Sequence, residues 1–267
     1  MAQRVLVTGG GTFLGDSIAA ALLAEGAEVT LLVRPGAEDK LGTLAQRTRW
    51  WAADVWDPAS LKGRARGIQH VIHTVGGMNA DPAKGLTYHW LNFVSARNVA
   101  NLCVNAGVPH MVLMSAVRAP WVSRQYISTK REAEAYVTRV GLRATIIRAP
   151  VAYWRGAPRP LFYRLMTFLG AVPPISWLGM GRIAPMPVDV LARGVARLTL
   201  EPRQSSAVFY AKHLRKRNTG RERRRGLSVE MNPADESKPG QQAAHPFQWQ
   251  DEDAPFGWTP TNGDPRR

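Results

Sequence analysis

Tyr126 and Lys130 are four residues apart, and Ser115 precedes Tyr126 by eleven residues. Residues i and i+4 of a helix lie on one face, so we expect the ammonium group of Lys130 near the phenol of Tyr126. A neighbouring cation lowers the pKa of a phenol from its usual value of about 10. Such a phenol can exchange a proton with a carbonyl or an alcohol that Ser115 orients. We therefore predict a catalytic site at Ser115, Tyr126 and Lys130; the alternative is a solvated helix face that carries Tyr126 and Lys130.

A glycine-rich turn near the N-terminus supports the catalytic interpretation. One apolar run precedes the turn at residues 4–8 and another follows it at residues 18–24, which is the order strand, turn, helix. Glycines let the backbone approach a pyrophosphate, and the N-terminus of the helix attracts its negative charge. A hydride carrier beside a proton donor suits a redox reaction. We predict a nicotinamide dinucleotide site with a turn made of Gly9, Gly10, Gly11, Thr12, Phe13, Leu14 and Gly15.

Strand-like and helical patterns alternate through the first 150 residues. The strands are expected at 4–8, 28–33, 50–53, 70–75, 110–115 and 144–148. The helices are expected at 14–25, 86–106 and 125–140, with a short one after Pro58. This alternation predicts an α/β fold with a doubly wound parallel sheet, which binds ligands at the carboxyl ends of its strands. Residues that follow successive strands should therefore line one rim with the glycine turn, namely Arg34, Asp54, Val55, Thr74, Gly76, Ser115 and Pro150.

The rest of the chain divides into two further parts. Residues 1–150 form the predicted dinucleotide-binding domain, and residues 151–211 are expected to build a small cap with helices at 161–170 and 188–200 and a last strand at 207–211. Periodicity is expected to stop after Lys212. Residues 212–267 then form a basic linker and an extended tail that binds a partner or becomes ordered on it.

Arg34 bears on the choice between the two nicotinamide dinucleotides. It ends the second predicted strand, where an acidic residue would bind the ribose 2'-hydroxyl of NAD. An arginine at this position instead suits the 2'-phosphate of NADP(H), which we predict as the cofactor; the alternative is that Arg34 is simply solvated.

The formal net charge of +15 indicates a polyanionic neighbour, such as a membrane surface, nucleic acid or an acidic protein. The alternative is a coding bias toward arginine. Eight basic residues and one acidic residue lie between 212 and 225, where the run can contact phosphates or act as a solvated linker. No aromatic residue interrupts that run, so RNA is the less favoured partner.

Several classes of protein are disfavoured by the composition. A single cysteine, Cys103, cannot form an intrachain disulfide, and its apolar neighbourhood is typical of a buried helix face rather than of a metal or redox site. The longest apolar stretch, 165–181, is too short for a spanning helix and is broken by Pro173 and Pro174. We expect no cleavable targeting peptide, because the first strand begins within a few residues of the N-terminus.

With these motifs in place, residues 3–211 resemble the extended or atypical short-chain dehydrogenases/reductases. Two further segments are similar to that family. The first is 54–58, which resembles its adenine-contacting acidic turn, and the second is 148–150 with Tyr153, which resembles the segment beside its nicotinamide. Thr12 stands where the family's Gly-x-x-Gly-x-x-Gly turn has its second glycine. A side chain there is expected to crowd the pyrophosphate or to shift the turn by one residue.

The segment 126–134 is most similar to the mitochondrial branch of the family, which includes the nucleotide-binding accessory subunit of respiratory complex I and a related protein of coenzyme Q biosynthesis. The resemblance implies an NAD(P)-binding accessory subunit at the matrix face of the inner mitochondrial membrane, which contacts subunits of a respiratory complex through residues 212–267. The alternatives are an NADP-dependent oxidoreductase or isomerase in quinone metabolism and an RNA-binding member of the superfamily. These alternatives differ in whether the protein turns over a substrate, and the sequence leaves that point open.

Residues 161–182 are the expected contact with an anionic membrane. No acidic residue occurs between Ala135 and Val188, whereas arginines and apolar segments alternate there. Aromatic rings can lie at headgroup depth while arginines bind lipid phosphates. The alternative is that these apolar residues line a substrate pocket and pack the cap.

Overall fold

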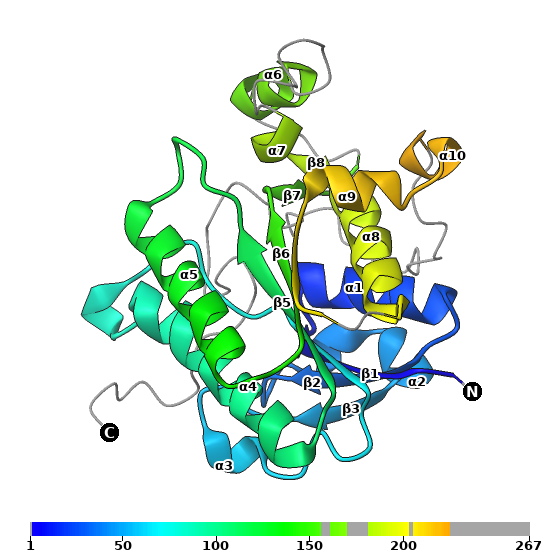
Figure 1. The fold of residues 1–267 in the computed structure, drawn as a ribbon, viewed down its shortest axis with the longest axis vertical. Helices are drawn as coiled ribbons and strands as arrows, with labels where there is room; N and C mark the ends of the chain where they lie inside the picture. Colours follow the sequence, from blue (N-terminus) through cyan, green and yellow to red (C-terminus); the bar gives the residue numbers. More distant parts are fainter. Residues whose placement is uncertain (1, 156–160, 170–180, 203–204, 225–267) are drawn as a thin grey trace.

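The computed structural model describes residues 2–155, 161–169, 181–202 and 205–224 (Figure 1). Seven parallel strands form one sheet in the order β3-β2-β1-β4-β5-β6-β9. The strands are β1 (Arg4–Gly10), β2 (Glu28–Val33), β3 (Arg49–Ala52), β4 (His70–His73), β5 (His110–Ala116), β6 (Ala144–Ala149) and β9 (Ala207–Tyr210). The predicted doubly wound parallel sheet is confirmed. Its strand order reverses between β1 and β4, and a crevice for ligands forms at such a switch point.

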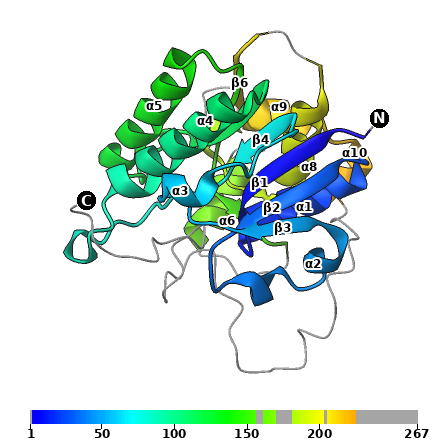
Figure 2. The ribbon, with the colours of Figure 1, turned by 90° about the horizontal axis from the view of Figure 1, so that it is seen from below.

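Helices cover both faces of the sheet (Figures 1 and 2). One apolar core lies under α1 (Phe13–Ala24) and α8 (Val188–Leu200), and the other lies under α3 (Pro58–Leu61), α4 (Ser95–Ala106) and α5 (Arg124–Arg139). Successive residues of a strand face opposite cores, so that Val5 and Val7 belong to the first core and Leu6 to the second. The continuous apolar runs of the central strands follow from this burial on both faces.

Short elements fill the connections. They are the 3-10 helices η1 (Glu38–Leu41) and η2 (Pro82–Lys84), the helix α2 (Leu44–Arg47), and the π-helix η3 (His89–Val94) that leads into α4. A single helix was expected over residues 86–106. The structure differs from this expectation because the helix begins as a π-helix, which turns Asn92 toward the loop after β4. There the Asn92 side chain donates to Gly77 O (2.9 Å) and accepts from Gly77 N (3.2 Å). Single wide turns of this kind are frequent at functional sites.

Residues 151–211 are divided between the main fold and a small attachment. The helix α8 packs on α1, and β9 pairs with β6, so both belong to the main fold rather than to a cap. The attachment contains the two-stranded sheet of β7 (Ala152–Tyr153) and β8 (Met186–Pro187), with α6 (Leu161–Leu169) and α7 (Gly181–Ile183). Figure 1 shows α6 and α7 beyond the carboxyl ends of the strands.

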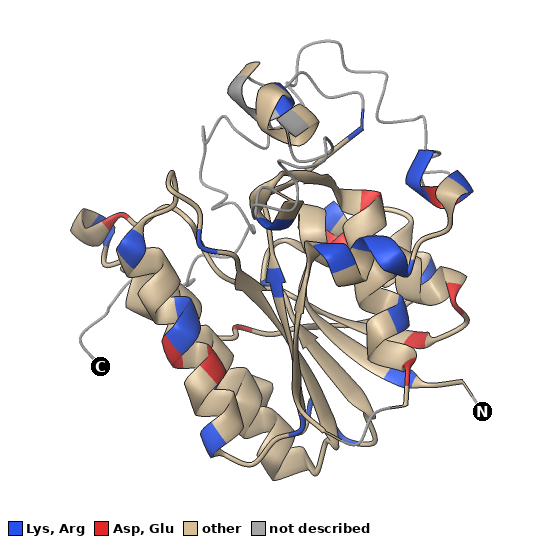
Figure 3. Ribbon diagram, turned by 45° about the horizontal axis from the view of Figure 1, so that its top comes forward, with Lys and Arg blue, Asp and Glu red and all other residues tan. Residues whose placement is uncertain are grey.

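The basic run after Lys212 differs from its prediction. The helices α9 (Ala211–Lys216) and α10 (Gly220–Arg224) continue the fold, so the expectation that periodicity stops after Lys212 is wrong. They are bound to α8, because Arg193 donates to Asn218 (2.8 Å) and Arg197 contacts Glu222 (2.6 Å). Figure 3 shows the basic residues of α9 and α10 beside acidic residues of neighbouring elements. The predicted tail beyond this point, 225–267, lies outside the described residues.

Candidate active site

The glycine turn connects β1 to α1 in a conformation that needs its glycines. Gly9 and Gly11 have φ values of +84° and +78°, which disfavour a side chain. A Cβ on Gly15 would lie 2.0 Å from Gly9 O, and one on Gly9 would lie 2.5 Å from the hydroxyl of Thr74. The turn therefore packs strand, helix and the β4 loop so closely that only glycine fits at these positions.

Thr12 fits this turn as the N-cap of α1. Its backbone is extended (φ −119°), and its hydroxyl donates to Gly9 O (2.6 Å) and accepts from Gly15 N (3.2 Å) as the N-cap of α1. The side chain is 6% exposed, so the hydroxyl is used within the turn. The first N–H groups of a helix have no partner within it, which leaves those of Phe13 and Leu14 to bind a phosphate.

Asp16 is an acidic neighbour of the turn that the sequence did not single out. Its carboxylate accepts a hydrogen bond from Gly11 N (2.8 Å). Burial raises the pKa of Asp16 to about 7, against the opposing effect of that hydrogen bond. A carboxyl group with a raised pKa therefore lies behind the turn that would bind a phosphate.

The remaining rim residues lie where the strand order places them. Arg34 follows β2 directly and accepts from Ala37 N (3.0 Å) through its carbonyl. The loop then returns to the turn, since a Cβ on Gly11 would be 3.1 Å from Cβ of Lys40. Lys40 is thus a second cation beside the glycine turn, which sequence reasoning missed because η1 is too short to show a periodic pattern.

The residues after β3, β4 and β6 complete the rim. Asp54 accepts from Trp56 N (2.8 Å), which holds the acidic turn closed over the buried Val55. The hydroxyl of Thr74 donates to Thr8 O (2.5 Å) and so joins β4 to β1 at the switch point. Pro150 follows β6 directly and is buried.

Lys130 lies in the interior at the carboxyl end of the sheet. Its side chain is 3% exposed, and its Nζ donates to Met114 O (3.3 Å). A Cβ on Gly76 would be 2.7 Å from that Nζ, and the centre of the Tyr126 ring is 5.9 Å from it. Burial lowers the pKa of Lys130 to about 8, although Glu134 acts in the opposite direction. The structure thus brings Gly76, Tyr126 and Lys130 together.

Tyr126 is as deeply buried as Lys130. The two side chains lie on one face of α5 as the spacing predicts, and Tyr88 lies against the Tyr126 ring with 6.0 Å between ring centres. Burial raises the pKa of the Tyr126 phenol above its usual value, with Arg131 opposing this rise. The predicted lowering of this pKa is therefore wrong, because desolvation outweighs the neighbouring cation. Among the described residues, the Tyr126 hydroxyl has no hydrogen-bond partner.

Ser115 lies near this pair but is bonded elsewhere. Its hydroxyl donates to Glu134 (2.5 Å) and accepts from Arg131 (3.1 Å). Arg148 on β6 binds the other oxygen of Glu134 at 2.6 Å, and Arg131 also contacts Glu134. These hydrogen bonds and cations outweigh burial and hold the pKa of Glu134 below its usual value. The network fixes α5 against β5 and β6, and it is a feature that the spacing of Ser115, Tyr126 and Lys130 does not reveal.

His73 is a further buried group beneath the rim. Its Nδ1 lies 3.1 Å from the hydroxyl of Thr8 and its Nε2 lies 3.4 Å from that of Ser95. Burial and the nearby Lys130 lower the pKa of His73 to about 3. The imidazole is therefore neutral under ordinary conditions, and its position as the last residue of β4 was the only signal in the sequence.

Two other kinds of site do not occur in the described part of the chain. In those ranges, no helix combines the length and the apolar character that crossing a bilayer requires. Within the same ranges, no group of three or more His, Cys, Asp or Glu residues is placed to hold a metal ion.

The sequence also matches a known family. Residues 9–154, more than half of the chain, match the NAD(P)H-binding family. The chain belongs to this family. It is 30% identical over 142 residues to an uncharacterized chloroplastic protein of Arabidopsis thaliana, covering 50% of this chain and 45% of that protein. It is 28% identical over 116 residues to human sterol-4-alpha-carboxylate 3-dehydrogenase (decarboxylating), covering 43% and 29%. The chain thus spans less than half the length of these relatives.

Solved structures have the same fold. The WbmG enzyme of Bordetella bronchiseptica, solved with NAD, superposes with a TM-score of 0.58 at 18% identity, covering 78% of this chain and 72% of that chain. The UDP-glucose 4-epimerase of Bifidobacterium longum, solved with NAD+ and UDP, gives a TM-score of 0.56 at 16% identity over 78% and 76%. These structures share the Rossmann-like sheet. The chain therefore combines membership of the NAD(P)H-binding family with a Rossmann-like fold.

Proposed function

We propose that this protein is an NADP-dependent oxidoreductase in which Tyr126 exchanges a proton with the substrate. The observation that carries the proposal is the buried Lys130, which lies between Gly76 and Tyr126 with a single hydrogen bond to the protein. Burying an ammonium group is costly unless it has partners, and an apolar side chain would fill the same space without that cost. A charge retained under this penalty is typical of a functional site.

The surroundings of Lys130 fit a nicotinamide dinucleotide. The glycine turn would hold the pyrophosphate through Phe13 and Leu14, and Lys130 lies across the switch point, beside Gly76 after β4 and Met114 on β5. When bound, the nicotinamide would accept or supply a hydride. Lys130 would bind the adjoining ribose and, as a cation, favour the ionised form of Tyr126 during proton transfer.

The preference for NADP(H) rests on charge beside β2. Arg34 follows the strand and Lys40 lies against the glycine turn, so two cations flank the position of the adenosine ribose. A 2'-phosphate would gain charge-assisted hydrogen bonds there. The two structures compared above contain NAD, so the preference is a property proposed for this chain alone.

Ser115 has a positioning role in this proposal. Its hydroxyl is engaged by Glu134 and Arg131, so it holds α5 and thereby Tyr126 and Lys130 in place. Orientation of a substrate carbonyl by Ser115 would require that hydroxyl to exchange Glu134 for the substrate.

The test is loss of the phenolic proton at Tyr126. Tyr126→Phe is expected to reduce the rate of NADPH oxidation with a panel of carbonyl compounds by roughly 10²- to 10⁴-fold, because general acid catalysis contributes about that much. Nucleotide affinity should change little. Tyr136→Phe is the matched control, since Tyr136 lies on the same helix and its hydroxyl contacts Asn101 (2.7 Å) at the surface. Equal rates for the two variants would refute a catalytic Tyr126.

The second candidate function is an accessory subunit of a mitochondrial respiratory complex, in which the nucleotide is structural. The exposed apolar residues of α6 favour a protein or membrane partner, and the motif similarity of segment 126–134 favours this branch. Its test is the native protein: co-migration with a respiratory complex supports the subunit, whereas a free monomer or dimer with turnover supports the enzyme. We give less weight to two further proposals. A quinone-related substrate is tested by the same carbonyl panel. An RNA partner for residues 212–225 is tested by whether RNA stays bound at moderate salt.

A further inference from the structure

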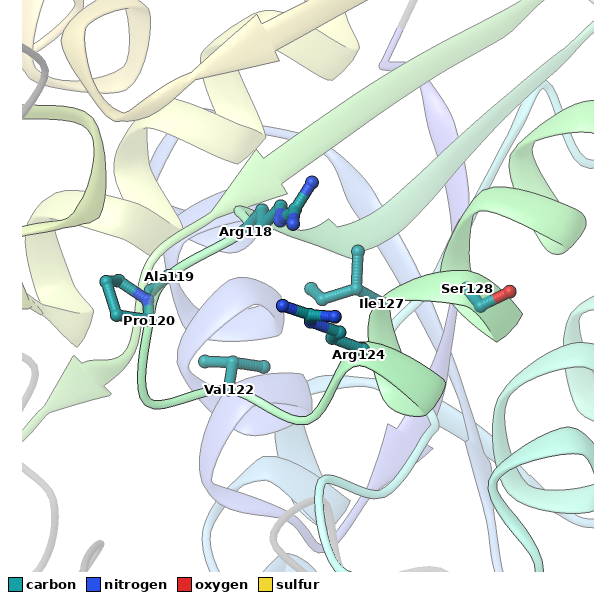
Figure 4. A pocket seen from close by; sticks show the side chains of 7 residues that line it. All are labelled: Arg118, Ala119, Pro120, Val122, Arg124, Ile127 and Ser128. Atoms are coloured by element: carbon teal, nitrogen blue, oxygen red, sulfur yellow. The ribbon is translucent and has the colours of Figure 1, made fainter.

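A pocket lies at the start of α5, the helix that carries Tyr126 and Lys130 (Figure 4). It has a volume of about 720 Å³ and is formed by the loop after β5 and the first turns of α5. Volumes of about 300–1,000 Å³ are typical of sites for small organic molecules. Ile127, which lines the pocket, is the neighbour of Tyr126 in the sequence, so the pocket lies on the helix that carries the proposed proton donor. The full lining is Arg118, Ala119, Pro120, Val122, Arg124, Ile127 and Ser128.

Two arginines supply the charge of this pocket. Arg118 comes from the loop and Arg124 is the first residue of α5. Within the described ranges, neither guanidinium has a hydrogen bond or an ion pair to the protein, whereas the nearby Arg131 and Arg148 are both bound to Glu134. No acidic residue occurs from 117 to 131. The pocket therefore holds two positive charges that no residue in the described part of the chain neutralises.

The position of Arg124 at the N-terminus of α5 adds to this excess of positive charge. The N-terminus of a helix carries a partial positive charge, so a cation in the first turn is unfavourable for folding. The first turn of α5 contains no acidic residue to offset it, and the hydrogen bond from Tyr126 N to the N-cap Ser123 is long, at 3.5 Å. An anionic group in the pocket would relieve this repulsion and gain hydrogen bonds from both arginines.

Apart from Ser128, the rest of the lining is apolar. Ala119, Pro120 and Val122 form the loop side, and Ile127 faces them from α5 (Figure 4). Burial of a hydrocarbon against these residues is favourable, while a strongly hydrated ligand would gain little from them. A ligand that satisfies both parts of the pocket must carry an anionic group on an apolar body.

We propose that the pocket binds a small amphiphilic anion, whose carboxylate or phosphate contacts Arg118 and Arg124 and whose apolar body lies against Val122 and Ile127. We further assign this anion as the substrate of Tyr126, and this assignment rests on the proposed function. The binding site itself does not depend on that function.

Calorimetric titration of the full-length protein with decanoate, decyl phosphate and decan-1-ol tests the site. Both anions should bind more tightly than the alcohol, and the double variant Arg118→Gln with Arg124→Gln should bind them roughly tenfold or more weakly, because charge-assisted hydrogen bonds are lost. Arg139→Gln, an exposed arginine at the other end of α5, is the matched control and should change nothing. Unchanged affinity in the double variant, or equal affinity for the alcohol, overturns the proposal.

Two further readouts separate this site from the proposed function. The ratio of affinities for decyl phosphate and decanoate identifies the anionic group. Probe binding should be the same in Tyr126→Phe as in the parent protein. If arginine-dependent binding persists while no anionic carbonyl compound supports NADPH oxidation, the pocket stands and the proposed function fails. If oxidation depends on Tyr126 but probe binding does not depend on the arginines, only the pocket proposal fails.

Discussion

At the scale of single residues, the site depends on side chains whose ordinary chemistry is altered by burial. Lys130 is less basic than usual, Tyr126 is less acidic than usual and Asp16 is less acidic than usual, and burial is the largest cause in each case. Desolvation disfavours the charged form of each group, whichever sign that charge has. A bound dinucleotide and substrate would change this balance by adding charges and hydrogen bonds at the same place.

Arg34 gives the first prediction at this scale. Arg34→Asp should reverse the cofactor preference, because the variant repels a 2'-phosphate and can accept from a ribose 2'-hydroxyl. One lost charge-assisted contact corresponds to about 1.5–3 kcal/mol, or roughly a 12- to 150-fold weaker affinity for NADPH. Fluorescence titration with NADPH and NADH measures both affinities. Arg47→Asp, an exposed arginine at the end of α2, is the control. Equal affinities of the parent protein for the two nucleotides would contradict the assignment of Arg34.

Asp16 gives the second prediction, which concerns pH. Because its pKa is raised from 3.8 to about 7 in the folded protein, the folded state holds a proton that the unfolded chain releases between these values. The free energy of unfolding contributed by Asp16 therefore falls as pH rises through this window. Asp16→Asn keeps an acceptor for Gly11 N and should remove this component. Denaturant unfolding of both proteins across the window measures it, and parallel pH profiles would show that the Asp16 carboxyl does not titrate there.

At the scale of elements, α6 has the most unusual surface. Leu161, Leu165 and Phe168 are 80%, 51% and 65% exposed and follow one face of the helix at i, i+4 and i+7, with the exposed Arg164 beside them. An exposed apolar stripe next to a cation suits an interface with an anionic bilayer. The structure describes the expected membrane contact, residues 161–182, only in part. Residues 170–180, which include Trp177, lie outside the described residues.

The prediction for α6 is flotation of the full-length protein with cardiolipin-containing liposomes at low salt. Leu165→Ser with Phe168→Ser should weaken flotation strongly, because the apolar surface of one leucine side chain and one phenylalanine ring is lost. Val104→Ser replaces an exposed apolar residue on α4, at 48% exposure, and should leave flotation unchanged. Flotation that is equally strong in all three proteins would rule out α6 as the membrane contact.

At the scale of the whole molecule, the C-terminal helices close the fold on the α1 side of the sheet. Arg197 binds Glu25 (2.7 Å) at the end of α1 and Glu222 (2.6 Å) on α10, so residues from three distant parts of the chain meet at one guanidinium. Arg217 binds Glu201 at 2.7 Å in the same region. Part of the basic run is therefore used inside the protein, which reduces the charge that is left for an external polyanion.

The whole-molecule prediction concerns Glu222. Arg197 is the main cause that lowers the pKa of Glu222 from 4.5 to about 2, so the carboxylate stabilises the fold above pH 4.5 and this contribution is lost as pH falls toward 2. Glu222→Gln should lower the free energy of unfolding at neutral pH by up to about 1 kcal/mol, as for partly exposed ion pairs. The difference from the parent protein should shrink in acid. Glu28→Gln, at an exposed position in β2, is the control. A Glu222 effect that is independent of pH would contradict the ion-pair account.

The sequence by itself determined the sheet and the rim. Alternating apolar runs placed most of the strands and helices within one or two residues of their observed bounds, because burial on both faces of a parallel sheet leaves a strong local pattern. Gly9, Gly15, Tyr126 and Lys130 were found from spacing alone, since a tight turn and a helix face are both set by local geometry.

Only the tertiary structure decided how these groups are used. The burial that raises the pKa of Tyr126, the bond of Ser115 to Glu134 and the inward turn of Thr12 all depend on which elements pack together. The helices α9 and α10 owe their place to ion pairs with residues far away in the sequence, and a local pattern contains no record of such partners. Desolvation and long-range pairing are properties of the packed molecule, so they become visible only when the chain is folded.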